Sequence, residues 1–387
     1  MEKILNNYSF QSVFKHPSIS NLNSYNQSVL GNISRCHTAQ NGYHLAQCNN
    51  ENCKEMKQQF HSCGNRHCPY CGNMKKDEWV ENRMNELLPT AYYHVVFTLP
   101  HELNGLILGN RKVLFSTLFD CASKTLLTHG KNPEFLGTEV GITMVLHTWG
   151  QDLSFHPHVH CIVTGGGFDG EKWVKAKREN NKFLFPTKSL AMMYKAMFMK
   201  ELENNNGIKW GIIDKENLLK NIRYKKWNVY AKAPFGGPAQ VVEYLGRYTH
   251  KIAITKHRIL EVNDKLLKFK YKDYADGSKV KQMWLSHEEF LRRFELHILP
   301  QRFVKIRHTG FLRNRHKMQR INAIRKSIGL GEALPKIQIP AAVRMLEKYG
   351  KDITKCPCCD TGTLVVFFDT RTKRVEKQAP IPSFAPS

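Results

Sequence analysis

A histidine-rich stretch near the middle of the chain reads Phe155-His156-Pro157-His158-Val159-His160-Cys161-Ile162-Val163-Thr164-Gly165-Gly166-Gly167. Its apolar and β-branched residues predict a β-strand that ends at the glycine triplet. Because side chains alternate faces along a strand, His156, His158 and His160 share one face of it. Two imidazoles about 6–7 Å apart along a strand could bind one metal ion between them. A polar sheet face that happens to carry histidines is the alternative interpretation.

A second strand at residues 142–149 precedes this one, with a short polar turn between the two. The pattern predicts a β-hairpin that places His147 beside His158. His147 is therefore the first candidate for a third metal ligand. Gln240 and His156 are the alternatives.

Composition and charge narrow the class of protein. The chain has 387 residues, 41% of them hydrophobic, and a formal net charge of +25. Such an excess of positive charge favours a polyanionic partner, with nucleic acid ahead of an anionic membrane surface. No apolar run approaches the ~18–20 residues of a membrane-spanning helix, and the N-terminus lacks the apolar core of a signal peptide. The sequence therefore predicts a cytoplasmic protein without a membrane partner.

Eleven cysteines in such a chain indicate metal sites rather than disulfides. Cys48 and Cys53 form one knuckle-like pair, and Cys68 and Cys71 form another. Two tight turns that deliver four thiolates suit tetrahedral zinc, so these four are the predicted structural zinc ligands. Further donors nearby could replace one of the four or build a second site; they are Cys36, Cys63 and His67. The later run Cys356-Pro357-Cys358-Cys359 has no evident second pair, and its metal status stays open.

A helix is predicted from Ala239, after the turn Pro234-Phe235-Gly236-Gly237-Pro238. Tyr244 and Tyr248 are four residues apart, so their phenols would lie on one helix face, one turn apart. A pair of core tyrosines is the alternative. Gly246 costs about 1 kcal/mol relative to alanine inside a helix, which indicates a close backbone approach.

The remaining pattern alternates helical and extended segments. Further helices are predicted at residues 75–88, 110–128, 188–205 and 286–298, and further strands at 92–99, 227–233, 251–254, 258–262, 266–274, near 280 and at 364–368.

Residues 301–326 are basic and contain no acidic residue. Aromatic and histidine side chains interleave with the cations, as in a groove that follows a phosphate backbone and stacks rings on bases. A solvated basic face is the alternative. The predicted DNA-binding residues are Arg302, Lys305, Arg307, Arg313, Arg315 and Lys317.

Together these features suit cleavage of a phosphodiester. A divalent cation held by histidines offsets charge on the scissile phosphate. A tyrosine can attack the phosphorus and keep the 5′ end covalently, while a second tyrosine one turn away attacks the next phosphate. No phosphate-binding loop of the G-x-x-x-x-G-K-[ST] type occurs in the sequence.

The chain resembles the two-tyrosine HUH transposases of rolling-circle bacterial insertion sequences. Six motifs that occur in the order of that family carry the resemblance; they are Ser62–Cys71, His147–Gly150, His156–His160, Tyr244–His250, Glu289–Phe294 and Gly310–Arg315. The resemblance implies an α+β fold with an antiparallel, RNA-recognition-like sheet flanked by helices and preceded by a small zinc-binding module. It also implies that Tyr244 and Tyr248 are nucleophiles and that Mg²⁺ or Mn²⁺ is the catalytic ion.

The expected organisation has three parts: residues 1–90 as a helical and zinc-binding domain, 91–326 as the catalytic domain, and 327–387 as an extension with a disordered tail. The expected partners are single-stranded DNA at the element ends and target DNA, in the bacterial cytoplasm at the nucleoid. Alternatives are a rolling-circle replication initiator or relaxase, and a zinc-containing DNA-binding protein without catalysis. The sequence does not indicate the oligomeric state.

Overall fold

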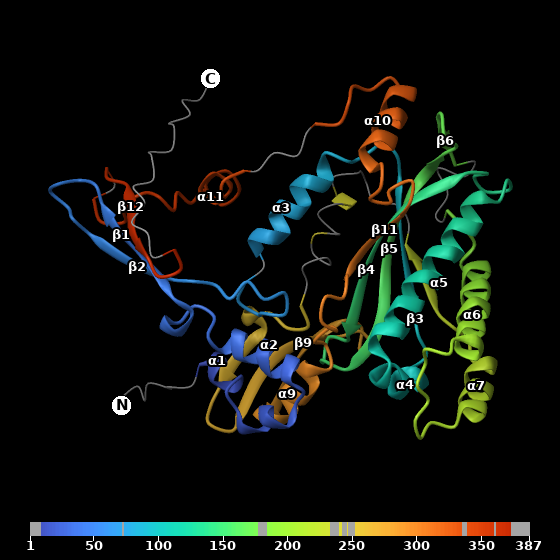
Figure 1. Cartoon of the computed structure of the whole chain (residues 1–387), viewed down its shortest axis with the longest axis horizontal. Helices are drawn as coiled ribbons and strands as arrows, with labels where there is room; N and C mark the ends of the chain where they lie inside the picture. Colours follow the sequence, from blue (N-terminus) through green and yellow to red (C-terminus); the bar gives the residue numbers. More distant parts are fainter. Residues whose placement is uncertain are drawn as a thin grey trace.

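A computed structural model describes residues 9–71, 73–176, 184–232, 240–241, 246, 252–334, 339–359 and 361–372. Its strands are β1 (Tyr43–Cys48), β2 (Met56–Phe60), β3 (Tyr92–Thr98), β4 (Glu139–Trp149), β5 (Phe155–Phe168), β6 (Trp173–Lys175), β7 (Val229–Lys232), β8 (Ile259–Val262), β9 (Leu266–Asp273), β10 (Lys279–Ser286), β11 (Ile306–Gly310) and β12 (Leu364–Asp369). Within the described residues these strands form three antiparallel sheets (Figure 1).

Helices surround the sheets. They are α1 (Phe10–Val13), α2 (Ser24–Ser34), α3 (Asn73–Met84), α4 (Asn104–Gly109), α5 (Arg111–Lys131), α6 (Thr187–Asn204), α7 (Lys215–Tyr224), α9 (His287–Glu295), α10 (Lys317–Ser327) and α11 (Ala341–Tyr349). The expected α+β class, with antiparallel sheets flanked by helices, is confirmed. Within the described ranges, every helix is too short or too polar to cross a lipid bilayer.

The main sheet has the strand order β11-β4-β5-β3-β7, with β6 paired to one end of β5. The long strands β4 and β5 form the predicted hairpin, and their register pairs His147 with His158 and Val145 with His160. On the other side of β5, β3 pairs Val96 with His160. The histidine strand is thus the central strand of the main sheet.

The two faces of the main sheet have different neighbours. Val159, Cys161 and Val163 point into the largest core, whose other side comes from α5 and α6. Alternation along β5 puts His158 and His160 on the opposite face, together with His147 of β4. We call this the histidine face. In Figure 1, α3 lies on this side of the main sheet and α5 and α6 lie on the other.

A second sheet joins the two ends of the chain in the order β12-β1-β2. The C-terminal strand β12 pairs with β1, from His44 opposite Asp369 to Cys48 opposite Leu364. The predicted division into residues 1–90, 91–326 and 327–387 stays a prediction. The pairing shows that the C-terminal part extends a sheet begun by the N-terminal part.

The third sheet, β10-β9-β8, packs with α1, α2 and α9 around a second core. Gly277 adopts a φ of +56° in the connection between β9 and β10, where the Asp-Gly pair predicts a turn. The strand predicted at residues 251–254 is wrong for 252–254, and residue 251 lies outside the described residues. Ile254 is fully buried, but the carbonyl oxygen of Ala253 accepts from Arg258 instead of joining a ladder.

Candidate functional site

Three histidines lie together on the histidine face. His147 comes from β4, whereas His158 and His160 come from β5. One ring nitrogen from each residue lies within 4.8 Å of the other two. His147 and His160 are buried, and His158 is half-buried. The cluster therefore reaches the surface on the side of His158.

Hydrogen bonds indicate which ring nitrogens of the β5 histidines carry protons. The Nδ1 of His158 lies 2.7 Å from the carbonyl oxygen of His156 and donates to it. The Nδ1 of His160 lies 2.9 Å from Nε2 of His94 on β3. Burial lowers the pKa of His94 to about 4, and Lys232 acts in the same direction, so His94 is neutral at pH 7. A neutral His94 can accept the proton of His160 Nδ1, which leaves Nε2 of His160 as a lone-pair donor.

With this assignment the Nε2 atoms of His158 and His160 both present lone pairs, 3.1 Å apart. Two lone pairs at this distance repel each other unless a proton or a cation lies between them. Nitrogen ligands about 2.0–2.1 Å from a metal ion are themselves separated by about 3 Å, so the spacing fits one shared divalent cation. His147 offers a third imidazole, and three protein ligands leave coordination positions open for water or a phosphate oxygen.

The alternative third ligands occupy different positions. His156 is exposed and lies outside the cluster of three ring nitrogens, although its ring centre is 5.2 Å from that of His158 and its carbonyl oxygen accepts from His158. Gln240 is helical and exposed, and its sequence position is one turn before Tyr244. The geometry favours His147 as the third ligand, and the ligand set stays a prediction.

Tyr244 and Tyr248 lie outside the described residues. Of the helix predicted around them, the structure describes Gln240, Val241 and Gly246, and all three are helical. The described part of the chain on both sides of Tyr244 thus agrees with the predicted helix.

Val241 connects this helix to the histidine face. Its side chain is buried against Tyr92, Val145 and Ile162. Val145 pairs with His160 across β4 and β5, and Ile162 follows His160 by two residues on the same strand face. The segment that precedes Tyr244 is therefore anchored beside the histidine cluster.

Gly246 lies where α3 approaches the same helix. A Cβ at this position would be 2.3 Å from Cγ2 of Val80 on α3. The close backbone approach that the sequence predicts at Gly246 is confirmed, and Val80 is the residue that requires it.

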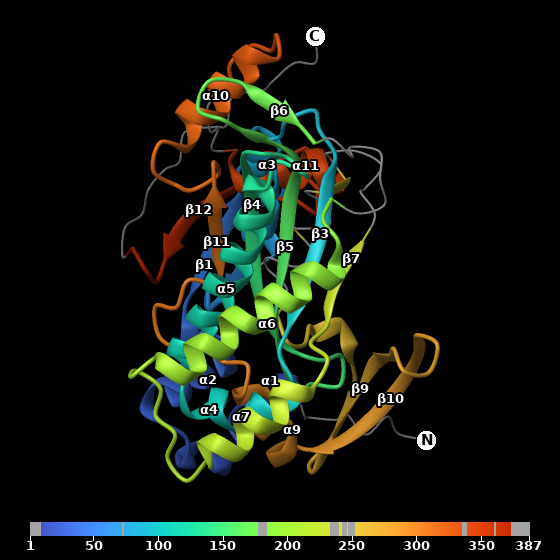
Figure 2. The same ribbon diagram turned by 90° about the vertical axis from the view of Figure 1, so that its right-hand side faces the viewer.

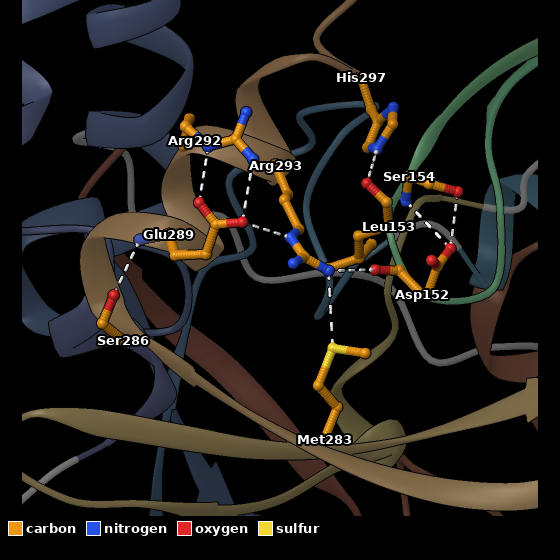
Figure 3. Close-up of polar contacts among 9 residues, drawn as sticks. All are labelled: Asp152, Leu153, Ser154, Met283, Ser286, Glu289, Arg292, Arg293 and His297. Atoms are coloured by element: carbon orange, nitrogen blue, oxygen red, sulfur yellow. Dashed lines mark hydrogen bonds and ion pairs between the residues drawn. The ribbon is translucent and has the colours of Figure 1, made fainter. Parts of the chain in front are cut away.

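Arg293 of α9 and His297, which follows that helix, hold the turn between β4 and β5 (Figure 3). Nη1 of Arg293 donates to the carbonyl oxygen of Asp152 at 3.1 Å, and Nε2 of His297 lies 3.1 Å from the carbonyl oxygen of Leu153. Glu289 accepts from Nε of Arg293 at 2.6 Å and thereby orients the guanidinium. Leu153 has a φ of +65°, a conformation that non-glycine residues rarely adopt, and these contacts stabilise it.

The same helix explains the motif Glu289–Phe294. Hydrogen bonds from Arg292 lower the pKa of Glu289 to about 2, against the effect of partial burial, and Arg293 adds to the shift. Phe290 and Phe294 are buried in the second core. Apolar residues of the motif thus fix α9, and its charged residues fix the turn beside the histidines.

The cysteines form two clusters rather than the one predicted site. Cys36, Cys63, Cys68 and Cys71 lie together, and Cys48, Cys53, Cys356 and Cys359 lie together; within each set the sulfur atoms are within 4.8 Å of one another. The predicted grouping of Cys48 and Cys53 with Cys68 and Cys71 is therefore wrong. Each knuckle pair finds its second pair elsewhere, because strand pairing between β1 and β12 brings the C-terminal cysteines to Cys48 and Cys53.

The first cluster has the chemistry of a zinc site. Its Cys63 and Cys71 sulfurs are 3.6 Å apart, close to the ~3.8 Å of a tetrahedral site with bonds of about 2.3 Å. Backbone N–H groups approach its sulfurs, from Tyr70 to Cys68 at 3.4 Å and from Cys63 to Cys36 at 3.3 Å. Hydrogen bonds from Cys36, then from Cys63 and Cys68, lower the pKa of the Cys71 thiol. The neighbouring thiols therefore favour a thiolate at Cys71, which is the form that binds zinc.

Comparisons with known proteins identify the family of the chain. Residues 141–320 match the family described as "Putative transposase", and residues 5–99 match the family described as "Transposase zinc-binding domain". The chain is 37% identical to "Putative transposase y4qJ" of Sinorhizobium fredii over 362 residues, which are 89% of this chain and 90% of that protein. The chain belongs to the transposase family that combines these two domains.

A second relative extends the comparison. The transposase is 28% identical over 330 residues to "Transposase for insertion sequence element IS801" of Pseudomonas savastanoi pv. phaseolicola, covering 84% of this chain and 79% of that protein. No solved structure matches the chain. The family identifies the transposase as an enzyme of insertion sequences that acts on DNA, with a zinc-binding domain at residues 5–99.

The basic segment of the transposase does not form one continuous groove in its described part. Nζ of Lys305 lies 5.1 Å from the ring centre of Trp149, which itself stacks on His147. Arg307 instead packs over Phe119 and donates to Ser116 on α5, on the other side of the sheet. Among the predicted DNA-binding residues, Lys305 is thus connected to the histidine cluster through Trp149.

Other cations of the segment are already paired with acids. Lys317 is mostly buried and lies 2.7 Å from Glu86, and Arg313 lies 2.7 Å from Glu139. Arg302 and Arg315 are exposed. The interpretation of the interleaved phenylalanines as stacking rings is wrong: Phe303 and Phe311 are 5% and 0% exposed, because they belong to the apolar cores.

Sequence reasoning missed His94. It lies on the strand predicted at residues 92–99, but its role depends on the pairing of β3 with β5, which brings it to His160. It also missed the alternating lysines of β9, Lys268, Lys270 and Lys272, although their spacing of two is visible in the sequence.

Proposed function

We propose that this transposase nicks single-stranded DNA at the ends of its insertion sequence and transfers the strand through a 5′-phosphotyrosine. Tyr244 and Tyr248 are the proposed nucleophiles, and His147, His158 and His160 would hold Mg²⁺ or Mn²⁺. The observation that carries the proposal is the convergence of three imidazoles on the sheet face that also buries Val241, three residues before Tyr244 in the sequence.

The proposed reaction exchanges one phosphate ester for another. The phenolic oxygen of one tyrosine attacks phosphorus, the bond to the 3′ oxygen breaks, and the phenolic proton passes to water or a nearby base. The leaving 3′ oxygen takes up a proton and becomes a 3′ hydroxyl. A 3′ hydroxyl on the receiving strand later attacks the phosphotyrosine and regenerates the phenol, so no external energy source is needed.

The histidines contribute through position. When bound, the divalent cation polarises the scissile phosphate and offsets its developing charge. His158 and His160 are held in position because both lie in the central strand of the main sheet, and a neutral His94 would accept a hydrogen bond from Nδ1 of His160. Mn²⁺ should support the reaction at lower concentration than Mg²⁺, because imidazole nitrogens are poorer ligands for the harder ion.

Zinc at Cys36, Cys63, Cys68 and Cys71 is proposed to be structural, because no acid or base of the histidine cluster belongs to that set. The proposed DNA substrates are single-stranded element ends and a target strand. An enzyme with these substrates works where the cellular DNA lies, so we expect it in the cytoplasm at the nucleoid. A rolling-circle initiator or relaxase shares this chemistry, and the family match favours transposition.

The experiment that tests the proposal incubates the full chain with single-stranded element ends and Mg²⁺ or Mn²⁺, followed by a denaturing gel. We expect a covalent protein–DNA adduct that the double change Tyr244→Phe and Tyr248→Phe abolishes. At least one single Tyr→Phe variant should still nick but fail to complete transposition in cells. Normal transposition by both single variants would contradict the assignment, and a non-catalytic DNA-binding protein would give no adduct.

A further inference from the structure

The second cysteine cluster unites residues from the two ends of the chain. Cys48 and Cys53 flank the connection between β1 and β2, whereas Cys356 and Cys359 precede β12. The sulfurs of Cys48 and Cys359 are 3.6 Å apart, and those of Cys53 and Cys356 are 3.8 Å apart. A tetrahedral zinc ion with four sulfur bonds of about 2.3 Å requires sulfur atoms about 3.8 Å apart. The four thiols therefore have the spacing of a zinc site.

Backbone groups around this cluster also match a zinc knuckle. The N–H of Asn50 points to the sulfur of Cys48 at 3.4 Å, and the N–H of Cys358 points to that of Cys356 at 3.4 Å. The first cluster contains the same contact, from a backbone N–H two residues after the cysteine. Such bonds orient metal-bound thiolates and reduce the charge that they carry.

Gly362 shows how closely the chain is wrapped around these sulfurs. A Cβ at this position would lie 2.2 Å from the sulfur of Cys48 and 3.2 Å from that of Cys359. Its N–H donates to Cys359 at 3.3 Å, and its carbonyl oxygen accepts from the N–H of Cys356 at 2.8 Å. Only glycine fits this position without displacing a sulfur atom.

We propose that Cys48, Cys53, Cys356 and Cys359 bind a second structural zinc ion that joins the C-terminal segment to the N-terminal sheet. The family zinc-binding domain matches residues 5–99 and so cannot supply these four ligands by itself. Both ends of the chain contribute ligands to the second zinc site. These ligands are separate from the residues of the proposed nicking reaction.

The site has a structural consequence for the rest of the molecule. Beside it, β12 pairs with β1, and His61 contacts Asp369 at 3.0 Å. α11 precedes the site in the chain and contacts α3. Its Arg344 forms a bidentate ion pair with Glu81 of α3 at 2.9 Å.

The C-terminal segment therefore contacts α3 through α11. On α3, the carboxylate of Asp77 contacts both Lys348 and Tyr349 of α11, the latter at 2.7 Å. Val80 of the same helix touches the position of Gly246. The second zinc ion thus fixes a segment that supports the helix beside the proposed nucleophiles.

The test is zinc analysis of the purified full chain by native mass spectrometry. We expect two zinc ions per chain, and one in the double variant Cys356→Ser, Cys359→Ser. The matched control is Cys358→Ser, because Cys358 is exposed and outside the cluster, and it should retain two. In hydrogen exchange, the double variant should lose protection in β1 and β12 while β3 to β5 keep theirs, which separates zinc loss from global unfolding.

One zinc ion in the unmodified chain would overturn the proposal. So would two zinc ions in the double variant, or one in Cys358→Ser. Gly362→Ala provides a second approach that keeps all four thiols: it should speed the release of one zinc ion to a competing chelator, and an unchanged rate would also count against the site.

A different observation concerns the outer face of the third sheet. Lys268, Lys270 and Lys272 alternate along β9 and share one face, and Trp284 of β10 is directly opposite Lys268. Nζ of Lys268 lies 5.2 Å from the ring centre of Trp284, which is 42% exposed. We call these four residues the lysine–tryptophan face. Figure 2 shows β9 and β10 at the edge of the molecule.

This face is not explained by the packing of the sheet. The opposite face, with Leu267, Phe269 and Leu285, fills the second core. In the part of the chain that the structure describes, none of the three lysines forms an ion pair with a carboxylate. Glu261 of β8 is the cross-strand neighbour of Lys268, but the lysines outnumber it. Lysines beside an exposed indole suit a strand whose phosphates bind lysine and whose bases stack on an aromatic ring.

We infer that the lysine–tryptophan face binds single-stranded DNA next to the histidine cluster. Arg258, between this sheet and the hairpin, donates to the carbonyl oxygens of Lys270 and Gln151, and Gln151 is in the turn that joins β4 to β5. The inference rests on the proposed function for its choice of a single strand over duplex DNA.

The test measures equilibrium binding of a single-stranded element end over a range of salt concentrations. Changing the three lysines to glutamine should weaken binding and lower the salt slope by about 2, at about 0.7 per phosphate contact. Trp284→Ala should weaken binding by about 5- to 100-fold through lost stacking. The matched control removes three exposed lysines from the helices on the other side of the main sheet, Lys112, Lys200 and Lys220, and should change the slope less.

An unchanged affinity and slope in the lysine variant, or an equal loss in the control, would overturn the inference. Stronger loss of duplex than of single-strand binding would overturn the choice of partner. The binding assay requires no covalent chemistry. If the unmodified protein forms no adduct but the lysine variant still loses affinity for DNA, the proposed function is contradicted and this inference stands.

Discussion

The histidine cluster and the two cysteine clusters differ in what holds their ligands in place. His158 and His160 are on the central strand of a six-stranded sheet, with a core of α5 and α6 behind them. The second cysteine cluster lies beside a small sheet in which all five residues of β2 are exposed. Little apolar surface is buried there, so bound metal must supply much of the stability of that sheet. The first cluster differs, because Cys36 and Cys68 are buried in the second core. The main sheet thus holds the histidines in place by its own packing, whereas we expect the sheet of β1, β2 and β12 to depend on zinc.

The largest expected effect follows from removing zinc. A strong chelator should unfold the sheet of β1, β2 and β12 and leave the main sheet folded, because structural zinc contributes about 10–16 kcal/mol to small modules. Hydrogen exchange would show loss of protection in β1 and β12 and unchanged protection in β3, β4 and β5. Simultaneous exchange in both regions would show that they unfold as one cooperative unit. It would contradict the predicted difference between the two sheets.

The next largest effect concerns a ligand of the histidine cluster. His160→Ala should reduce metal-dependent nicking by at least ~100-fold, since even the loss of a residue that only supports a metal ligand costs about 10- to 100-fold. Affinity for single-stranded DNA and the melting temperature should change little, because the sheet around His160 remains intact. A gel assay for nicking and an equilibrium binding assay check the two parts.

His156→Ala is the matched control for this change. His156 is on the same strand face and its ring centre is 5.2 Å from that of His158, but it is exposed and lies outside the cluster of three ring nitrogens. The control should nick normally. A similar loss in both variants would show that His156 belongs to the ligand set.

A smaller effect is expected at His94, which positions His160 without touching the metal. His94→Phe removes the acceptor and should raise the Mn²⁺ concentration for half-maximal nicking by about 10- to 100-fold. The rate at saturating Mn²⁺ should fall less. His94→Gln keeps an acceptor oxygen and should recover part of the loss; equal defects in both variants would indicate a packing role alone.

The smallest predicted effect tests the contact between α3 and the tyrosine helix. Gly246→Ala would place a Cβ against Val80, and overpacking costs about 1–3 kcal/mol, partly offset by about 1 kcal/mol of helix propensity. We expect a slightly lower denaturation midpoint and reduced adduct formation. Adding Val80→Ala should restore both, and failure of this rescue would mean that the contact is unimportant.

The histidine site could be predicted from sequence because its geometry is local. Alternation along one strand gives the shared face of His158 and His160, and a short turn gives the pairing with His147. The role of His94 could not be predicted in this way. It depends on which strand lies on the other side of β5, and nothing near His94 in the sequence specifies that partner.

The cysteine sites, in contrast, could not be predicted from local spacing alone. Local spacing identifies Cys48 with Cys53, and Cys68 with Cys71, but thiols are chemically equivalent and the sequence does not say which pairs combine. The pairing of β1 with β12 decides which cysteine pairs combine, because it brings together residues more than 300 positions apart. The basic segment failed for a related reason, because burial of Phe303 and Phe311 is decided by the cores and not by the charges beside them.

End labelling of the DNA shows which fragment becomes attached to the protein, and so tests whether a tyrosine is the nucleophile. A single-stranded element end is labelled at either its 5′ or its 3′ end and incubated with the transposase and Mn²⁺. Attack by tyrosine with release of a 3′ hydroxyl predicts that the 3′-labelled fragment migrates with the protein and that the 5′-labelled fragment is released. Attachment of the 5′-labelled fragment, or nicking without any covalent attachment, would contradict the account.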